Sequence, residues 1–436
     1  MTRSSRAALW ALALVAIAAP VRAQDTTYKG ITLNAQYNPL RDKVGIAVLP
    51  VTGAFGDSIR AIISRDLDYS DRFTVIPVDS TDPSALRAPG AGAGLNYPVF
   101  VHMAAAAIVQ ITPVATGLHV VLHDAARGQV VNVNEFAIPS GGLGRDWRLA
   151  VHGVSDEIER WITGQRGIAA TRIAYVRGQS MRIVDSDGAD EITVPTDQCG
   201  VSPAWNRTGT TVVYSTCGAG SRIMAIDLAT GRARALIGPT RNTTYLTPVF
   251  MPDGNTVVYS RAGENGSDLF TISATGGTPH RVTSGQGTDN TNPAPSPNGR
   301  RFVFTSGRLG HPELYITDAD GTNVQVLTDF ENSDTTFRSD PDWSPDGRQI
   351  AYSERSHGRF QVRTVQASGS TPHFLTSEGE NEQPSWAPDA RHLVFTSTRT
   401  GVRQLWIMDS ESGRMRQLTF SAGARLAAWS PRLSGQ

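Results

Sequence analysis

Cysteine and lysine are scarce in this sequence. Only Cys199 and Cys217 occur among 436 residues, and two thiols without a nearby pair of histidines cannot fill a zinc shell. Lysine occurs only at Lys29 and Lys43, so arginine carries the remaining positive charge, and 40 basic side chains balance 40 acidic ones. Because there is no basic stripe or charge run, we expect neither nucleic acid nor an anionic lipid surface among the partners.

Catalytic motifs are also missing. The sequence contains no Gly-x-Ser-x-Gly elbow, no His-Glu-x-x-His pair, no phosphate-binding loop and no Cys-x-x-Cys pair. Its nine histidines are scattered, and we expect them to be ordinary surface residues. His119 and His123 share a predicted strand, where a spacing of about 13 Å prevents them from holding one metal ion. We therefore predict a protein that is not an enzyme and needs no cofactor.

Long apolar runs are absent apart from one at the start of the chain. Two arginines precede the apolar stretch 7–19, and the small-residue site Val21-Arg22-Ala23 follows it. This pattern predicts a signal peptide over residues 1–23 and therefore export. A membrane anchor needs about 20 apolar residues, and no second run of that length occurs. Gln24 rather than a cysteine follows the site, which argues against a lipid anchor, so we expect any membrane association to be peripheral and through partners.

A short phrase recurs six times in the second part of the chain. Its successive starting positions (203, 248, 293, 341, 384 and 427) lie 45, 45, 48, 43 and 43 residues apart. This period fits one four-stranded blade of a β-propeller and excludes shorter helical or leucine-rich repeats. The copies are PAWNRTG (203–209), PVFMPDG (248–254), PAPSPNG (293–299), PDWSPDG (341–347), PSWAPDA (384–390) and a truncated AAWSPR (427–432).

Each repeat has the pattern of four strands. The phrase predicts an inner strand ending in a tight turn, because proline presets φ, the Asp or Asn side chain bonds the backbone and glycine accepts a positive φ. A β-branched and aromatic run follows, as at 257–259, and further runs such as 269–272 complete the blade. A unit lacking its inner strand (172–194) precedes the first phrase, and a lone inner strand (427–430) follows the last full unit. Since these two complete each other, we predict a six-bladed ring closed by the C-terminal strand.

Residues that recur in the copies point to structure. Asp253, Asp346 and Asp389 lie in the tight turns, and we interpret them as turn formers rather than acid or base groups, because catalysis needs one asymmetric site. The tryptophans of the phrase are expected to pack between neighbouring blades. They are Trp205, Trp343, Trp386 and Trp429.

The two cysteines flank the first phrase. A simple hairpin centred on the turn 206–210 places Cys199 opposite Cys217, and an exported protein meets an oxidising compartment. We therefore predict a disulfide between them. The alternative is a pair of unbonded, half-buried small side chains.

The region before the repeats predicts a small α/β domain over residues 41–165, joined by a short linker to the propeller at 170–436. Ahead of it, residues 24–40 have no core pattern beyond a short alternation, and they predict either an arm that adds a strand to a partner's sheet or a disordered linker. The arm residues expected to contact a partner are Tyr28, Ile31 and Leu33. The expected order of the domain is strand 44–51, helix 57–69, strands 73–78, 107–114, 118–123 and 130–137, and helix 146–163.

The loops that precede each phrase vary between repeats, and this variation predicts the binding surface. In a propeller these loops gather on one face around the mouth of the channel. Their side chains are polar and of both signs, which suits a protein partner better than a hydrophobic small molecule. The candidate contact residues are Asp289, Asn290, Asn292, Arg338, Asp340, Glu380, Asn381, Glu382 and Arg425.

The chain also resembles a known family nearly from end to end. The residues that carry the resemblance are 63–78 (ISRDLDYSDRFTVIPV), the junction 150–176 and blade segments such as 340–353, and they are similar to those of the TolB family of the Tol-Pal cell-envelope system. This resemblance implies a periplasmic, non-enzymatic protein. It implies that the propeller face binds the peptidoglycan-associated lipoprotein Pal and that the arm binds TolA, for outer-membrane integrity and constriction at cell division. Other outer-membrane proteins are further candidate partners.

Two alternatives belong to other classes. One is an exported propeller that binds a glycan, a metal ion such as calcium in the channel, or another ligand. The other is the accessory propeller of a prolyl-oligopeptidase-type hydrolase that lacks its catalytic domain, since this sequence continues for only six residues after Ser430.

Overall fold

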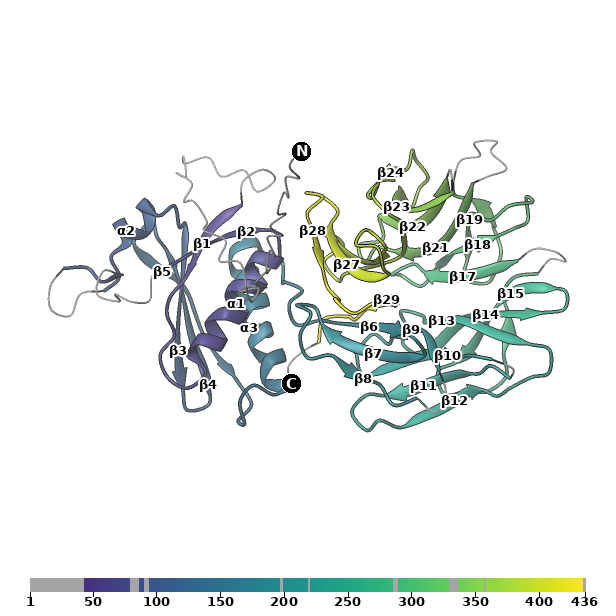
Figure 1. The fold of residues 1–436 in the computed structure, drawn as a ribbon, viewed down its shortest axis with the longest axis horizontal. Coiled ribbons are helices and arrows are strands. Elements are labelled where there is room, and N and C mark those ends of the chain that lie inside the picture. The colour runs from purple at the N-terminus through teal and green to yellow at the C-terminus, as the bar shows by residue number, and fades with distance from the viewer. Residues whose placement is uncertain are drawn as a thin grey trace, which may run out of the picture.

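The structure of the protein is a computed structural model. It describes residues 43–78, 86–89, 94–196, 199–218, 220–284, 289–328, 336–356 and 358–433. Within these ranges an α/β domain lies beside a β-propeller, and the two long helices of the first domain lie between its sheet and the propeller (Figure 1). The predicted signal peptide and the arm, including Tyr28, Ile31 and Leu33, lie outside the described residues.

The N-terminal domain is a five-stranded sheet with helices. Its elements are β1 (Val44–Val48), α1 (Gly56–Tyr69), β2 (Phe73–Ile76), α2 (Tyr97–His102), β3 (Ala107–Val114), β4 (Gly117–Asp124), β5 (Gln129–Ala137) and α3 (Arg145–Thr163). The strand order is β2-β1-β3-β4-β5, in which β1 is parallel to both of its neighbours and the other pairs are antiparallel. The strands and the two long helices confirm the elements predicted from the sequence.

Apolar residues at helical spacing explain why α1 and α3 cover one face of this sheet. Ile59 and Ile63 of α1 and Val151 and Ile158 of α3 are buried, and they share one core with the strands. The opposite face carries a second core that includes Phe100 of α2. The sequence analysis missed α2, because a helix of six residues has too few turns to show a hydrophobic period.

The propeller consists of six four-stranded antiparallel sheets. Its strands are β6 (Arg172–Arg177), β7 (Ser180–Asp185), β8 (Ile192–Thr193), β9 (Gly200–Trp205), β10 (Thr211–Thr216), β11 (Ile223–Asp227), β12 (Ala233–Ile237), β13 (Thr244–Phe250), β14 (Thr256–Gly263), β15 (Gly266–Ser273), β16 (His280–Arg281), β17 (Asn290–Pro295), β18 (Arg301–Ser306), β19 (Glu313–Asp318), β20 (Gln325–Val326), β21 (Phe337–Trp343), β22 (Gln349–Ser356), β23 (Arg359–Gln366), β24 (His373–Phe374), β25 (Asn381–Trp386), β26 (His392–Ser397), β27 (Gln404–Asp409), β28 (Met415–Gln417) and β29 (Ala424–Trp429). Each recurring phrase lies on an inner strand, as predicted.

The ring closes through its last strand. β29 is the inner strand of the sheet β29-β6-β7-β8, and it pairs antiparallel with β6, with Ala424 opposite Arg177 and Trp429 opposite Ile173. This arrangement confirms the six-bladed propeller closed by the C-terminal strand. The pairing also covers the edge of β6 that would otherwise lack a partner strand.

The recurring residues have the structural roles expected of them. The indole Nε1 of Trp205 in β9 donates to the carbonyl of Ala428 in β29 at 3.0 Å. This bond joins the blade of β9 to the neighbouring blade that β29 closes. All four tryptophans of the phrase are buried. Asp253 accepts hydrogen bonds from the backbone N–H groups of Asn255 and Thr256, as a turn former does.

Cys199 and Cys217 form a disulfide in the structure. They flank the hairpin of β9 and β10, in which Gly200 lies opposite Thr216, and their Cα atoms are 5.6 Å apart. This distance is ordinary for a bonded pair. The bond therefore fastens the open end of that hairpin.

Candidate functional site

The two ends of the propeller differ in what they contact. Each inner strand begins at the loop that leads in from the previous blade and ends at the tight turn. The tight turns and the outer turns near 185–190 and 409–414 meet the N-terminal domain, as the bonds from Asp68, Asp71 and Arg65 show. The opposite end, which we call the loop face, carries the loops between blades and the turns between second and third strands. The described part of the N-terminal domain therefore does not cover the loop face.

Several residues expected to contact a partner on this face are buried instead. Asn290 and Asn381 are fully buried and Arg338 is only 5% exposed. Asn290 accepts a hydrogen bond from Ser306 at 2.8 Å, and Asn381 donates to Gln361 at 2.9 Å. The expectation that these three side chains are exposed was wrong, because each one completes the hydrogen bonding of neighbouring strands.

Arg338 links two blades. Its guanidinium donates to Glu313 of the preceding blade at 2.7 Å and to Glu354 of its own blade at 2.9 Å. Burial alone would lower the pKa of Arg338, but its bonds to these two carboxylates outweigh burial and raise it. The side chain therefore positions the loop rather than presenting a charge to solvent.

The remaining predicted residues lie nearer to solvent. Asp289 is exposed, while Glu380, Glu382 and Arg425 are half-buried, and Glu382 pairs with Arg403 at 3.2 Å. The last two predicted residues, Asn292 and Asp340, line the central channel. The predicted set is thus divided between the rim of the loop face, the channel and the interior.

The loop face also exposes apolar side chains that the sequence analysis did not select. Phe420 lies in the loop between β28 and β29, Phe337 is the first residue of β21, and they are 79% and 36% exposed. Leu309 and Val402, in turns between second and third strands, are 52% and 45% exposed. Exposed aromatic and aliphatic side chains on one surface are typical of a protein-binding site. Their signal in the sequence was an apolar residue within a polar loop.

A ring of six equivalent residues lines the channel. Each has a positive φ between 45° and 59°, and a register shift interrupts the pairing of the inner strand at the same place. Positive φ is rare for residues other than glycine. Its recurrence at the equivalent position of all six inner strands shows that this conformation is a regular part of the blade. The ring residues are Ser202, Thr247, Asn292, Asp340, Gln383 and Leu426.

The channel encloses a cavity of about 590 Å³ between the inner strands. Asn292 donates a hydrogen bond to Asp340 of the next blade at 2.7 Å. Gln383 likewise accepts one from the backbone N–H of Leu426 of the next blade at 3.0 Å. Burial raises the pKa of Asp340. Two pairs of ring residues, Asn292 with Asp340 and Gln383 with Leu426, are therefore bonded to each other between blades.

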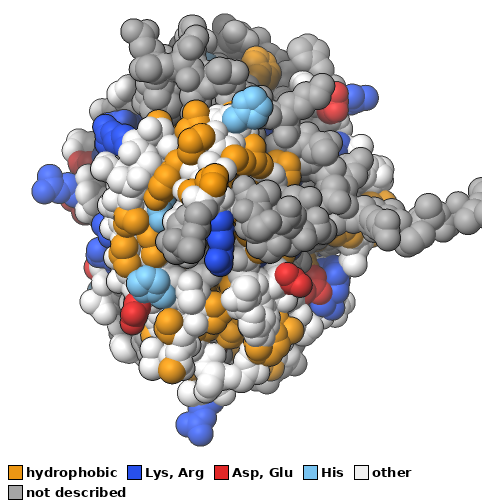
Figure 2. All heavy atoms as spheres, turned by 90° about the vertical axis from the view of Figure 1, so that its left-hand side faces the viewer, with side chains coloured by type: hydrophobic (Ala, Val, Ile, Leu, Met, Phe, Trp, Pro, Cys, Tyr) orange, Lys and Arg blue, Asp and Glu red, His pale blue; other side chains and the backbone are white. Residues whose placement is uncertain are grey.

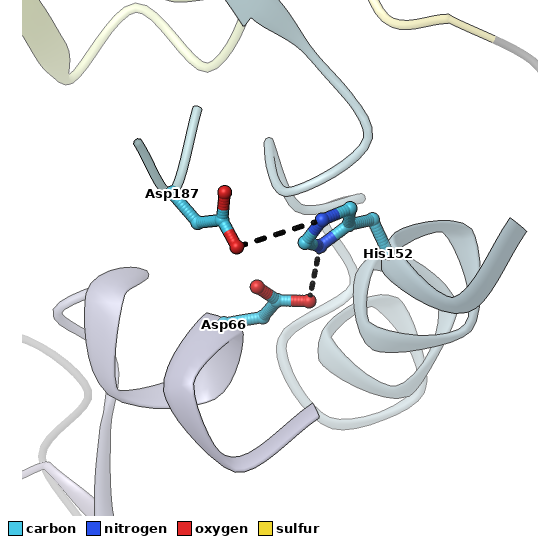
Figure 3. A group of neighbouring side chains, drawn as sticks. All are labelled: Asp66, His152 and Asp187. Atoms are coloured by element: carbon cyan, nitrogen blue, oxygen red, sulfur yellow. Dashed lines mark hydrogen bonds and ion pairs between the residues drawn. The ribbon is translucent and has the colours of Figure 1, made fainter. Parts of the chain in front are cut away.

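The interface between the domains is built from buried ionic groups. His152 of α3 lies between Asp66 of α1 and Asp187, which follows β7 in the propeller (Figure 3). Nδ1 of His152 is 2.8 Å from Asp66, and Nε2 is 3.7 Å from Asp187. Burial alone would lower the pKa of His152, but Asp66 and then Asp187 raise it. This histidine therefore links the two helices of the N-terminal domain to the propeller.

These three residues have the geometry of a candidate metal site, because their ligand atoms lie within 4.8 Å of one another. However, Asp187 already pairs with two guanidinium groups, those of Arg65 and of Arg148, the latter at 2.7 Å. Each nitrogen of His152 also faces a carboxylate. Since the cations of the protein balance these acids, the cluster fits an ion-pair network better than a metal ion.

A second cluster of the same kind lies at the neighbouring blade. His392 is 1% exposed, with Nδ1 2.7 Å from Asp389 and Nε2 3.4 Å from Asp71 of the N-terminal domain. Burial opposes the charged form, but Asp389 and Asp71 raise the pKa of His392 to about 9. The expectation of surface histidines was wrong for His152, His392 and His123, which lie in these clusters and in the N-terminal core.

The linker between the domains is held by one carboxylate. Asp156 of α3 accepts hydrogen bonds from the backbone N–H groups of Ala169 and Ala170 at 2.6 Å and 3.0 Å. Burial raises the pKa of Asp156 to about 7, although these two bonds oppose the shift. Nearby, burial raises the pKa of Glu159 to about 8. The ion pair of Glu159 with Arg72, at 3.0 Å, acts in the opposite direction and is outweighed. The linker is therefore part of the packed interface.

These features define a two-domain β-propeller protein with an uncovered loop face and a tightly packed domain interface. Within the described ranges we find no helix with the length and apolar character required to cross a bilayer. A family model described as the TolB beta propeller domain matches residues 159–433. The chain belongs to this TolB family.

Known proteins of the same kind are similar to the chain over different extents. Tol-Pal system protein TolB from Methylococcus capsulatus is 30% identical over 211 residues, 44% of this chain and 47% of the relative, and that from Escherichia fergusonii is 32% identical over 198 residues, 42% of this chain and 44% of the relative. The matched part thus spans about half the length of the curated relatives. The crystal structure of TolB from Acinetobacter baumannii, at 26% identity, covers 89% of this chain and 97% of its own, with a TM-score of 0.76.

Proposed function

We propose that the protein is a non-enzymatic scaffold of the Tol-Pal system in the periplasm. In this proposal the loop face binds the peptidoglycan-associated lipoprotein Pal, and the arm at residues 24–40 binds TolA. Binding at both sites would support outer-membrane integrity and constriction at cell division. The observation that carries the proposal is the similarity to TolB from Acinetobacter baumannii over nearly the whole chain, which includes both domains.

The loop face supports the first part of the proposal. It lies at the end of the propeller opposite the N-terminal domain, so a partner can approach it without separating the domains. Phe420 and Phe337 offer apolar contacts, and Asp289 and Glu380 supply charge around them. An apolar centre with a polar rim is the usual composition of a specific protein interface.

The test is the affinity of the full chain for the soluble domain of Pal. We expect Phe420→Asp and Phe337→Asp each to weaken binding by about tenfold or more, because each replaces an exposed aromatic side chain of the proposed contact with a charge. The control is Phe374→Asp in the outer strand β24, where the side chain is 66% exposed but lies away from this face. Equal affinity of all three variants, measured by titration calorimetry, would contradict the proposed surface.

The arm is tested by a deletion of residues 24–40. We expect the shortened protein to lose binding to purified TolA and to keep its affinity for Pal, since the arm precedes the first strand of the folded domain. Loss of both affinities would assign the arm a structural role, and retention of both would remove it from the TolA site.

A further inference from the structure

Two arginines at the domain interface each have a buried nitrogen atom without a hydrogen-bond acceptor. Arg145 begins α3 of the N-terminal domain, and Arg172 begins β6 of the propeller. Nε of Arg145 is 2.7 Å from a carboxylate oxygen of Asp190. Nε of Arg172 donates to Asp185 at 3.0 Å. Among the described residues nothing accepts a hydrogen bond from Nη2 of either arginine, although both atoms are buried. Such atoms in a folded protein usually bond a water molecule or an ion, because a charged donor buried without a partner is costly.

Both arginines line one small cavity of about 90 Å³. This volume is enough for a few water molecules or for one small ion. The side chain of Arg145 is 28% exposed, so the cavity lies close to solvent on that side. Its other walls are mostly apolar and come from the blade of β6 and the neighbouring blade of β9. The apolar side chains are Ile183, Ile192, Val194, Trp205, Ile226 and Leu228.

The two guanidinium groups lie close enough to repel each other. Burial lowers the pKa of Arg145, and the charge of Arg172 lowers it further. Asp190 and Asp185 act in the opposite direction, but both contact these arginines through Nε and leave the Nη2 atoms without an acceptor. A negative charge beside both Nη2 atoms would remove the repulsion, whereas a water molecule would not.

Charge is concentrated at this interface. On the outer face of the N-terminal domain the charged side chains lie scattered (Figure 2). At the interface they form a cluster that includes His152, whose pKa Asp66 and Asp187 raise above the ordinary 6.5 although burial opposes the charged form. At pH 6 the described cluster therefore has five cations against four carboxylates. The cations are Arg65, Arg145, Arg148, Arg172 and His152, and the carboxylates are Asp66, Asp185, Asp187 and Asp190.

We propose that the cavity between α3 and β6 binds one small monovalent anion, such as chloride, through Nη2 of Arg145 and Nη2 of Arg172. A single negative charge matches the surplus of one positive charge in the cluster. The apolar walls disfavour fluoride and sulfate, because these anions are strongly hydrated and lose more on leaving water. The bound anion would join the N-terminal domain to the propeller. This site is distinct from the loop face and from the arm, so the inference goes beyond the proposed function.

The experiment measures thermal unfolding of the full chain at pH 6 as sodium chloride replaces sodium fluoride at constant ionic strength. An anion that binds only the folded protein raises the melting temperature. Without a site, the more strongly hydrated fluoride should stabilise the protein at least as well as chloride, because such anions are excluded from protein surfaces. We expect the reverse order, with a melting temperature that rises as chloride or bromide replaces fluoride.

Two variants locate the site. Arg145→Gln should weaken chloride affinity, obtained from the dependence of the melting temperature on chloride concentration, by about tenfold or more, because it removes a charged donor. Ile192→Phe keeps both arginines and fills the cavity from the half-buried strand β8, so it should abolish the effect of chloride. The control is Arg281→Gln, which removes the same charge from an exposed ion pair with Asp268 and should leave the effect unchanged.

A crystal of the natural protein soaked in sodium bromide provides a direct measurement. We expect an anomalous scattering peak within hydrogen-bond distance of both Nη2 atoms. Bromide peaks only at exposed arginines would overturn the proposal. Fluoride stabilising the protein as well as chloride would show that water alone occupies the cavity. Equal chloride affinity of Arg145→Gln and the natural protein would assign the anion to another part of the chain.

Discussion

Nε2 of His392 lies 3.4 Å from Oδ2 of Asp71, although 321 positions separate the two residues in the chain. Asp71 follows α1 in the N-terminal domain, and His392 begins β26 in the propeller. On its other side His392 contacts Asp389 at 2.7 Å, and Arg414 pairs with Asp71 at 2.9 Å. A buried imidazole thus holds carboxylates of both domains, which makes the docking of the domains dependent on its protonation.

Domain docking should weaken as pH rises from 6.5 to 9. The folded pKa of His392, about 9, lies above its ordinary value, so its stabilisation is complete below pH 6.5 and is lost as pH rises through 9. The difference between the folded and the ordinary pKa of His392 corresponds to about 3 kcal/mol of folding free energy. Glu159, with a pKa raised to about 8, acts in the same direction, because its protonated form is the one favoured by burial.

The measurement is thermal unfolding at constant ionic strength from pH 6 to 9. We expect the melting temperature of the natural protein to fall over this range and that of His392→Gln to change much less. An equal slope for both proteins would show that another group controls the dependence. His373→Gln is the control, since that side chain is exposed in β24.

Removing Asp156 should destabilise the linker. Asp156→Ala leaves the buried N–H groups of Ala169 and Ala170 without their acceptor, at a cost of about 1 to 3 kcal/mol for each. Asp156→Asn keeps one acceptor oxygen and should lose about half as much. Urea unfolding measures the change, with the exposed turn variant Asp253→Ala as the control. A loss no larger than that of the control would contradict this role.

Truncation of Trp429 should open the ring. Its indole is 6% exposed, packs in the core of the closing blades and donates to Oγ1 of Thr171 at 2.8 Å. We expect Trp429→Ala to lower the free energy of unfolding by about 3 to 5 kcal/mol, because it creates a cavity at the closing blade. Phe374→Ala, on the exposed outer strand, should cost little. Proteolysis within β6 in the first variant but not in the second would identify the opened blade.

Reduction of the disulfide should destabilise the propeller without unfolding it at room temperature. Cys199 and Cys217 are separated by 18 positions, and closing a loop of this length contributes about 3 kcal/mol. The double variant Cys199→Ser with Cys217→Ser should melt at the same lower temperature with or without reductant. The natural protein should reach that temperature only in reductant. If reductant does not change the melting temperature of the natural protein, the two thiols are unbonded in solution.

The propeller could be predicted from the sequence because its information is local and repeated. A tight turn such as 251–254 and the alternating run after it specify a hairpin within about 15 residues, and six copies remove the ambiguity of any single one. The disulfide could be predicted from the equivalent hairpin of β9 and β10, which the two cysteines flank. The helix α2 could not be predicted, because it has no repeat and fewer than two turns.

The surface could be predicted only in part, because exposure depends on contacts between distant residues. Nothing near Arg338 in the sequence shows that Glu313 and Glu354 enclose it. The interface was missed for the same reason, since His152 meets Asp187 only after the domains dock. Comparison of the repeats indicated which loops vary. The packing of neighbouring blades decides which side chains of these loops reach solvent.

The pairing of β29 with β6 also sets an order of events during synthesis. The ribosome makes β6 before the other strands of the propeller and β29 after them, with almost the whole propeller between the two. The edge of β6 must therefore wait, unpaired, while five other blades form beside it. In a nascent chain of this design the edge of β6 stays available to aggregation or to a chaperone until β29 has been made.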